Sequence, residues 1–262
     1  MIDFFDVSPL KEQIIFDTHA HYDDERFSEY LDELLAGIQN HGVGGVVTCG
    51  CDGESSKKAM QLSEKYPFIY FSAGIHPGNI ESGTTLSEIK KIAEHKRCVA
   101  IGEIGLDYYW VDDNKPQQKK LFEEQIVLAK ELNLPVIVHD REAHSDTLKI
   151  LKKYKPKGVV HSFSGSVEMA EEILKLGMYI GIGGVITFKN AKKLPDVVKM
   201  LPEDKIVLET DAPYLAPVPF RSKTNNSSLI YLTAEKIAEL RNNDTLKILK
   251  TTYQNAVNLF NI

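Results

Sequence analysis

The chain has 262 residues, a length that suits one large α/β barrel or two small domains. Hydrophobic residues make up 43% of it and charged residues 26%, as in an ordinary soluble globular protein. The net charge is -6, whereas proteins that hold long duplex nucleic acid by charge alone are usually basic. Any action on nucleic acid must therefore depend on a local site.

The three cysteines, Cys49, Cys51 and Cys98, are not spaced like zinc-finger ligands, so we expect them to be reduced and intracellular. The first residues carry neither a basic region nor a long apolar stretch, and we expect no signal peptide. No apolar run approaches the roughly 18 residues that a membrane span needs. These observations predict a cytoplasmic protein that does not enter membranes. Nothing in the sequence indicates an obligate protein partner.

Short runs rich in valine and isoleucine alternate with longer amphipathic segments along the chain. The short runs predict strands at 14–17, 43–48, 69–73, 98–102, 135–139, 158–161, 179–182 and 205–209. Helical spacing of apolar residues predicts helices at 29–40, 117–132, 143–154, 167–176, 191–200, 228–241 and 244–260. Eight strands alternating with helices favour a parallel sheet closed into a TIM (β/α)8 barrel, and an open doubly wound sheet is the alternative.

No repeat or flexible linker interrupts this pattern. We therefore expect one domain over residues 14–262, preceded by an N-terminal extension at 1–13. The longest irregular segment, 214–226, follows the last predicted strand, where a barrel places an active-site loop.

Residues that commonly bind metals stand at the carboxyl ends of five of the predicted strands. His19 and His21 are two apart and can point to the same face of a strand. The others are Glu103, His139, His161 and Asp211. The carboxyl ends of barrel strands form one face, so residues some 190 apart in sequence can meet there.

Four imidazoles and two carboxylates suit zinc, manganese or iron. One zinc ion would leave several of them unused, whereas two ions that share a carboxylate use all six. The alternative is that some of the six are ordinary core residues whose hydrogen bonds are satisfied. That interpretation could explain a single histidine at a strand end, but it does not readily explain ligand-type residues at the ends of five strands.

These residues lie in stretches that resemble the TatD family of metal-dependent deoxyribonucleases, within the amidohydrolase superfamily. The matching stretches are 17–21 (DTHAH), 74–77 (GIHP), 102–108 (GEIGLDY), 135–141 (PVIVHDR), 161–165 (HSFSG) and 208–217 (LETDAPYLAP). They occur in the family's order from about residue 14 to the C-terminus, and as a set they are highly specific.

The resemblance implies an eight-stranded barrel that hydrolyses phosphodiesters in DNA, often from the 3′ end. It also implies two divalent metal ions (Zn²⁺, Mg²⁺ or Mn²⁺) bridged by Glu103. One ion would be held by His19, His21 and Asp211, and the other by His139 and His161. Asp211 would accept the proton of the attacking water. We therefore expect Asp211 and Glu103 to be catalytic.

Contacts with substrate are predicted from position. His76 follows the third strand and can reach a phosphate oxygen or serve a structural role. Arg141 can clamp a phosphate through two hydrogen bonds or form a salt bridge on the barrel face. Arg221 is a second candidate for phosphate binding. Asp107 is expected to orient a ligand or a loop.

Other residues are given mixed or structural interpretations. The aromatic run 108–110 can stack on a base of a single strand or pack within its loop. Cys49 and Cys51 are interpreted as small, partly buried residues that bind no metal.

The chain departs from the family after Pro217. The family usually has Arg-Gly-Lys-Arg-Asn-Glu-Pro at the place where this chain has Arg-Ser-Lys-Thr-Asn-Asn-Ser at 221–227. This loop lies near the substrate, so the departure leaves nuclease efficiency and substrate length open.

The sequence thus favours an exonuclease that acts on single-stranded or frayed 3′ ends of DNA. One alternative is an amidohydrolase-type enzyme for a small ester, lactone, amide or phosphotriester, because fold and metals serve many reactions. A second is a metal-binding scaffold without turnover.

Overall fold

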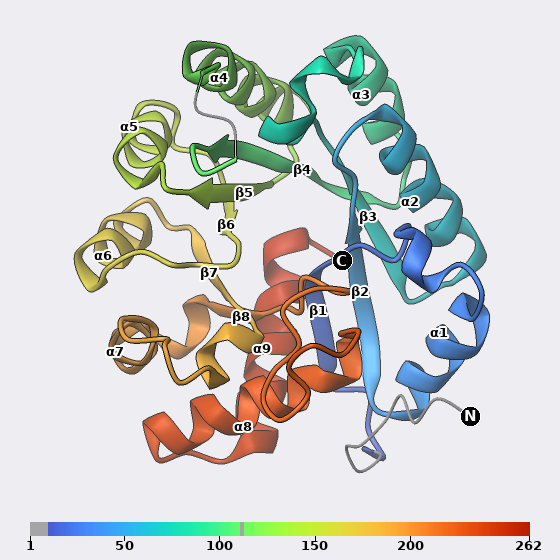
Figure 1. Ribbon diagram of the computed structural model, residues 1–262, viewed down its shortest axis with the longest axis vertical. Coiled ribbons are helices and arrows are strands. Elements are labelled where there is room, and N and C mark those ends of the chain that lie inside the picture. Colours follow the sequence, from blue (N-terminus) through green and yellow to red (C-terminus); the bar gives the residue numbers. More distant parts are fainter. Residues whose placement is uncertain (1–9, 111–112) are drawn as a thin grey trace.

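The computed structural model describes residues 10–110 and 113–262. Eight strands form a single parallel sheet in the order β1 to β8, each paired with the next along the chain. They are β1 Ile15–Ala20, β2 Val43–Cys49, β3 Ile69–Ala73, β4 Cys98–Asp107, β5 Val136–Arg141, β6 Gly158–Val160, β7 Tyr179–Ile182 and β8 Ile206–Leu208. The sequential order excludes a doubly wound sheet and confirms the TIM-type barrel, with the strands encircled by helices (Figure 1).

The helices follow the strands in regular alternation. They are α1 Leu31–Asn40, α2 Gly53–Lys65, α3 Leu86–Ala93, α4 Lys115–Glu131, α5 His144–Tyr154, α6 Val167–Lys175, α7 Leu194–Met200, α8 Ile230–Arg241 and α9 Thr245–Phe260. Helices α2 and α3 were not among the predicted segments. The side chain of Asp52 caps α2 and that of Thr85 caps α3. None of the helices in the described ranges is long and apolar enough to cross a membrane.

The seam between β1 and β8 is held by side chains and by a short bridge rather than by a full ladder. The Thr18 hydroxyl donates to the Leu208 carbonyl over 3.1 Å, and Ala20 pairs with Ala212 beyond the end of β8. The barrel is therefore nearly closed, and the chain just past β8 is fixed beside β1.

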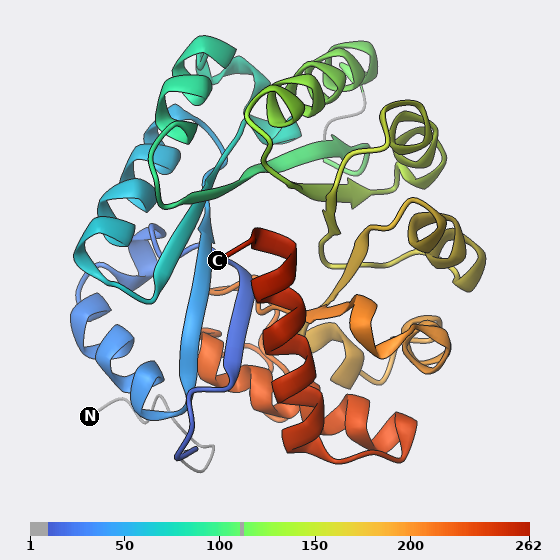
Figure 2. The same ribbon diagram turned by 180° about the vertical axis from the view of Figure 1, so that it is seen from behind.

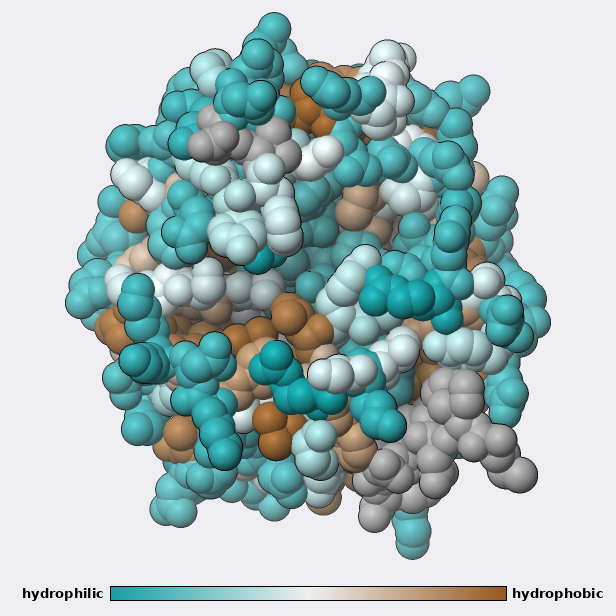
Figure 3. Space-filling view, viewed as in Figure 1, coloured by the Kyte–Doolittle hydropathy of each residue, from teal (hydrophilic) through white to brown (hydrophobic). Residues whose placement is uncertain are grey.

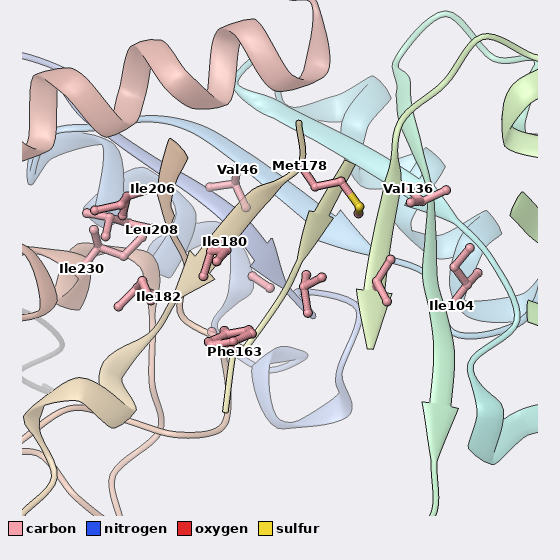
Figure 4. Close-up of a cluster of buried hydrophobic side chains, with 14 of the residues drawn as sticks. Val46, Ile104, Val136, Phe163, Met178, Ile180, Ile182, Ile206, Leu208 and Ile230 are labelled. Carbon is pink, nitrogen blue, oxygen red and sulfur yellow. The ribbon is translucent and has the colours of Figure 1, made fainter. Parts of the chain in front are cut away.

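Alternate residues of each strand face opposite sides of the barrel wall. Val136 and Val138 of β5 pack outward in the larger buried cluster, whereas Ile137 belongs to the smaller cluster inside the barrel. Figure 4 shows part of the larger cluster, including Ile180, Ile182, Ile206 and Leu208. Two residues beyond Ile137, His139 points to the inside as well, so the alternation of the strand directs this imidazole to the barrel mouth.

Helix α9 closes the other end of the barrel. Its residues Ala256, Leu259 and Phe260 belong to the inner cluster, and the Phe260 ring stacks on Phe16 at 6.1 Å between centroids. Figure 2 shows α9 lying across this end of the barrel. The inside of the barrel is therefore filled with side chains and closed at this end by α9, and the open face lies at the carboxyl ends of the strands.

The predicted extension, 1–13, lies largely outside the described residues, which begin at residue 10. Leu10 packs against the edge of the main cluster.

Candidate metal centre

All six predicted ligands meet at the carboxyl ends of the strands. His19 lies in β1, Glu103 in β4 and His139 in β5. His21 and His161 each follow directly after a strand, and Asp211 lies three residues beyond β8. Strand β4 continues past 102, where it was predicted to end, so Glu103 is an inward residue of the strand and is 4% exposed.

Glu103 stands between two groups of imidazoles. Its Oε1 lies 2.6 Å from His139 Nδ1 and 2.7 Å from His161 Nε2. Its Oε2 lies 3.3 Å from His19 Nε2 and 3.7 Å from His21 Nε2. Each carboxylate oxygen thus faces a different pair of the four predicted histidine ligands, an arrangement suited to a bridging ligand.

Asp211 completes the group around His19 and His21. Its Oδ1 lies 3.6 Å from His19 Nε2 and 3.5 Å from His21 Nε2, and the two Nε2 atoms are 3.1 Å apart. Nitrogen and oxygen ligands about 2.1 Å from a tetrahedral zinc ion are about 3.4 Å from each other. The spacing of these donor atoms therefore fits a common metal ion.

The other ring nitrogens of two of these histidines have partners that set their orientation. His21 Nδ1 lies 3.0 Å from the Cys49 carbonyl oxygen, and His139 Nε2 lies 3.3 Å from Asp107 Oδ2. Metal-binding histidines commonly donate their second N–H to such a carbonyl or carboxylate. Asp107 orients a predicted ligand, as its position suggested.

The electrostatic balance of the site holds the carboxylates in their charged form. Burial alone would raise the pKa of Glu103, but the imidazoles of His161, His19 and His76 outweigh it and hold the pKa well below its ordinary value. Burial also opposes ionisation of Asp211, yet the hydrogen bond from His21 and the charges of nearby histidines lower its pKa. Both residues are thus in the protonation state that a metal ligand requires.

Glu209 is a buried carboxyl group of the site that the sequence reasoning missed. It is 1% exposed, accepts a hydrogen bond from the backbone N–H of Ser162, and has Oε1 4.0 Å from His161 Nδ1. Burial raises its pKa to about 8. Its position two residues before Asp211, at the end of β8, is the signal that could have identified it.

The structure places two further residues against Glu103. His76 Nδ1 accepts a hydrogen bond from the Gly78 N–H, which caps the turn after β3, while its Nε2 lies 3.7 Å from Glu103 Oε1. Cys51 Sγ lies 4.0 Å from both Glu103 Oε2 and His21 Nδ1. The prediction that Cys51 is partly buried is confirmed, and its thiol lies beside the predicted ligands because β2 ends at Cys49 and the chain then turns into the site.

The site opens into a cavity of about 740 Å³ at the carboxyl ends of the strands. Figure 3 shows the surface hollowed near the middle of this face, among hydrophilic side chains. The cavity walls carry Asp23, Asp24, Asp52 and Asp140, whereas Arg141 is the only arginine or lysine that lines it within the described residues. Arg221 lies on the Phe188 ring, 3.7 Å from its centroid, and is not among the lining residues.

Comparison with known proteins identifies the family of the chain. A family model described as "TatD related DNase" matches residues 16–261. The chain is 42% identical over 254 residues to an uncharacterized metal-dependent hydrolase, YabD, of Bacillus subtilis, which covers 95% of this chain and all of the relative. It is 33% identical over 259 residues to the 3'-5' ssDNA/RNA exonuclease TatD of Erwinia tasmaniensis, and the match covers 95% of this chain and 100% of the relative.

A solved structure shows the same architecture. The crystal structure of YJJV, a TatD homolog from Escherichia coli K12, superposes with a TM-score of 0.90 at 34% identity and covers 95% of this chain and 99% of its own. The relatives match essentially over their full length, and the fold agrees with the family model. The chain therefore belongs to the TatD family of metal-dependent hydrolases.

Proposed function

We propose that this protein is a two-metal phosphodiesterase that removes nucleotides from single-stranded or frayed 3′ ends of DNA. The observation that carries the proposal is the position of Glu103, whose two oxygens face separate pairs of histidines. His19, His21 and Asp211 would hold one divalent ion, His139 and His161 the other, and Glu103 would join them. Zn²⁺, Mg²⁺ and Mn²⁺ are the candidates, and the mixed imidazole and carboxylate set suits zinc and manganese best.

Divalent ions held in this way would supply a Lewis acid for a nonbridging phosphate oxygen and offset the charge of the diester. The chain itself supplies the proton acceptor. Asp211 is ionised, lies at the open mouth of the site with 22% of its side chain exposed, and can take the proton of an attacking water. Glu103 is almost fully buried and serves to position the ligands.

The cavity indicates how a phosphate would be held. Its walls are acidic, and Arg141 is the only lining arginine or lysine in the part of the chain that the structure describes. Attraction of an anion must therefore come from bound metal and from one guanidinium, which leaves no broad basic track for a duplex. A relative named as a 3'-5' ssDNA/RNA exonuclease supports the same substrate class.

A comparison of substrates tests the proposal. One sequence is supplied with Zn²⁺, Mg²⁺ or Mn²⁺ as a 5′-labelled single strand, a blunt duplex and a closed single-stranded circle, beside an ester, a lactone and a phosphotriester. We expect stepwise shortening of the linear single strand from its 3′ end and an intact circle. Rapid cutting of the circle would overturn the end-directed assignment. Turnover of the small esters without any cutting of DNA would assign the protein to the alternative class of small-substrate hydrolases.

The two predicted phosphate contacts can be separated by substitution. Arg141→Ala should lower kcat/KM for oligonucleotides by about ten- to a hundredfold, because a charge-assisted hydrogen bond contributes about 1.5–3 kcal/mol. Arg221→Ala is the matched comparison, since Arg221 packs on Phe188 rather than in the cavity. Metal content should stay unchanged in both variants. Equal losses in the two would show that Arg141 has no special role at the cleaved phosphate.

A further inference from the structure

Two large aromatic side chains are exposed at the mouth of the metal centre. Trp110, in the turn after β4, is 70% exposed, and Tyr214, in the loop after β8, is 46% exposed. Both line the cavity that contains Glu103 and Asp211. Singly exposed apolar side chains are common, but these two rings line the same cavity, where a bound ligand would meet them.

The backbone of Trp110 is tied to the metal centre. Asp107 Oδ1 accepts hydrogen bonds from the N–H groups of Tyr109, at 2.9 Å, and Trp110, at 3.1 Å. The other oxygen of the same carboxylate lies 3.3 Å from His139 Nε2. One buried carboxylate thus sets both the orientation of a metal ligand and the position of the indole.

Arg141 joins this aromatic group to the cavity. Its guanidinium lies over the Tyr109 ring at 4.3 Å and over the Trp110 ring at 5.4 Å. The Tyr109 ring packs edge to face against Trp110, with 4.8 Å between the ring centroids. Tyr109 does not line the cavity, so it packs against Trp110 and Arg141 from outside the cavity. The cavity wall therefore presents an aromatic face next to a cation, which are the two chemistries of a nucleotide-binding surface.

Tyr214 is fixed from another side of the same cavity. Its N–H donates to the Asp211 carbonyl over 2.8 Å, and its hydroxyl donates to Asp24 Oδ2 over 3.2 Å. The Arg26 guanidinium, itself paired with Asp24, covers one face of the ring at 4.1 Å. The ring is held in place without being buried, and its remaining surface lines the cavity.

We propose that Trp110 and Tyr214 are stacking platforms for unpaired nucleobases on either side of the reacting phosphate. The ligand class is a single-stranded nucleic acid whose bases have left their partners, and recognition depends on ring faces rather than on base identity. This inference rests on the proposed phosphodiesterase function and extends it. It gives a reason for a preference for single strands and frayed ends over intact duplex, because neighbouring base pairs cover the ring faces inside a duplex.

Trp110 is the only tryptophan in the chain, so its fluorescence reports on this position alone. The metal-loaded protein is titrated with a short single strand of phosphorothioate linkages, which resist hydrolysis, and with an abasic strand of the same length and backbone. We expect the strand with bases to quench the fluorescence and the abasic strand to leave it nearly unchanged. Equal quenching and equal affinity for both strands would overturn the proposal.

Substitutions separate the ring from the rest of the side chain. Trp110→Ala should raise the Kd for the single strand, measured by anisotropy, by about five- to a hundredfold, the range found for loss of one stacked base. Trp110→Phe and Tyr214→Phe should retain most of the affinity, whereas Tyr214→Leu should lose it to a similar extent. Leu246→Ala, which removes an exposed apolar side chain on α9, is the matched control and should bind normally. None of these variants should change metal content.

These experiments distinguish failure of the stacking inference from failure of the proposed phosphodiesterase function. If the wild-type protein cuts DNA ends as expected but Trp110→Ala and Tyr214→Leu keep the wild-type Kd and KM, only the stacking inference is overturned. If no oligonucleotide is cut or bound at all, both are overturned. Cleavage with a raised KM and an unchanged kcat in these variants supports the inference, since the rings bind bases without taking part in the chemistry.

Discussion

At the scale of single residues, Glu103 and Asp211 differ in how they are held. Glu103 is buried within a strand and lies within 4 Å of five histidines of the site. Asp211 lies on a loop with a φ of 59°, a left-handed conformation in which asparagine and aspartate are among the most favoured non-glycine residues. The first therefore organises the donor atoms, and the second can approach a substrate.

Removal of Glu103 tests its place between the two histidine groups. Glu103→Ala should weaken metal binding by at least about a hundredfold, because loss of a mere orienting partner already costs ten- to a hundredfold. Metal content per chain after dialysis is the measurement. Glu131→Ala, an exposed glutamate on α4, is the control and should keep its metal. Full occupancy in Glu103→Ala would contradict the bridging role.

Asp211→Asn tests the proton acceptor. The asparagine keeps the shape and tolerates the left-handed backbone, so the loop should stay in place. Turnover should fall by at least about a hundredfold, the low end for loss of a general base. Initial rates on a linear single strand, with metal supplied in excess, measure this. A rate near that of the wild type would mean that another group accepts the proton.

At the scale of elements, the seam between β1 and β8 decides whether the site forms. Thr210 lies in this seam and its hydroxyl donates to Asp17 Oδ2 at 2.6 Å, while the Ala212 N–H donates to the Thr210 hydroxyl at 3.0 Å. Asp17 also accepts from Ser227 Oγ at 2.7 Å. The loop that carries Asp211 is thus fixed to the strand that carries His19 by buried hydrogen bonds rather than by a continuous ladder.

Thr210→Val removes the hydroxyl at nearly constant volume. The buried Ala212 N–H loses its partner and Asp17 Oδ2 keeps only Ser227, so the free energy of unfolding should fall by about 1–3 kcal/mol. Denaturant unfolding followed by circular dichroism measures it. Thr251→Val, at a partly exposed position of α9, is the matched control and should change stability by less than about 0.5 kcal/mol. Equal stability of the two variants would exclude a special role for the seam.

At the scale of the whole molecule, the two ends of the barrel are built differently. The carboxyl ends of the strands carry polar ligands around a cavity, and the amino ends are closed by α9. The inner cluster of Phe16, Ile137, Val207 and their neighbours lies between the two. Stability and chemistry are therefore assigned to opposite ends of the same strands, as is usual for this barrel.

Phe260→Ala tests how much the closure of the barrel by α9 contributes to stability. Phe260 is 4% exposed and stacks on Phe16, so its removal should lower the free energy of unfolding by about 3–5 kcal/mol, the range for a buried phenylalanine. The metal affinity of the folded variant should remain, because the site lies at the other end. Urea unfolding and metal titration of the same sample test both statements. A loss below about 1 kcal/mol would show that α9 covers the barrel without sealing it.

The sequence by itself determined the barrel and the meeting of the six predicted ligands on one face of it. Buried parallel strands are readable as short apolar runs, and a histidine or carboxylate placed directly after such a run, as in His139 and His161, must lie on the face where strand ends meet. Helices α2 and α3 were not predicted from the sequence because α2 is mostly polar and α3 is short. Helix α3 buries a short apolar stripe of Ile89, Ile92 and Ala93, whereas α2 buries small residues and depends on its cap and on packing.

Only the tertiary structure decided which atoms of these residues meet. No spacing rule indicates that the two oxygens of Glu103 face different histidines, that Cys51 and His76 turn toward it, or that Arg221 lies on Phe188. The exposure of Trp110 was equally hidden. The physical reason is that sequence pattern sets the side of a strand on which a residue stands, whereas loop path and side-chain rotamer, settled by neighbours distant in sequence, set what it touches.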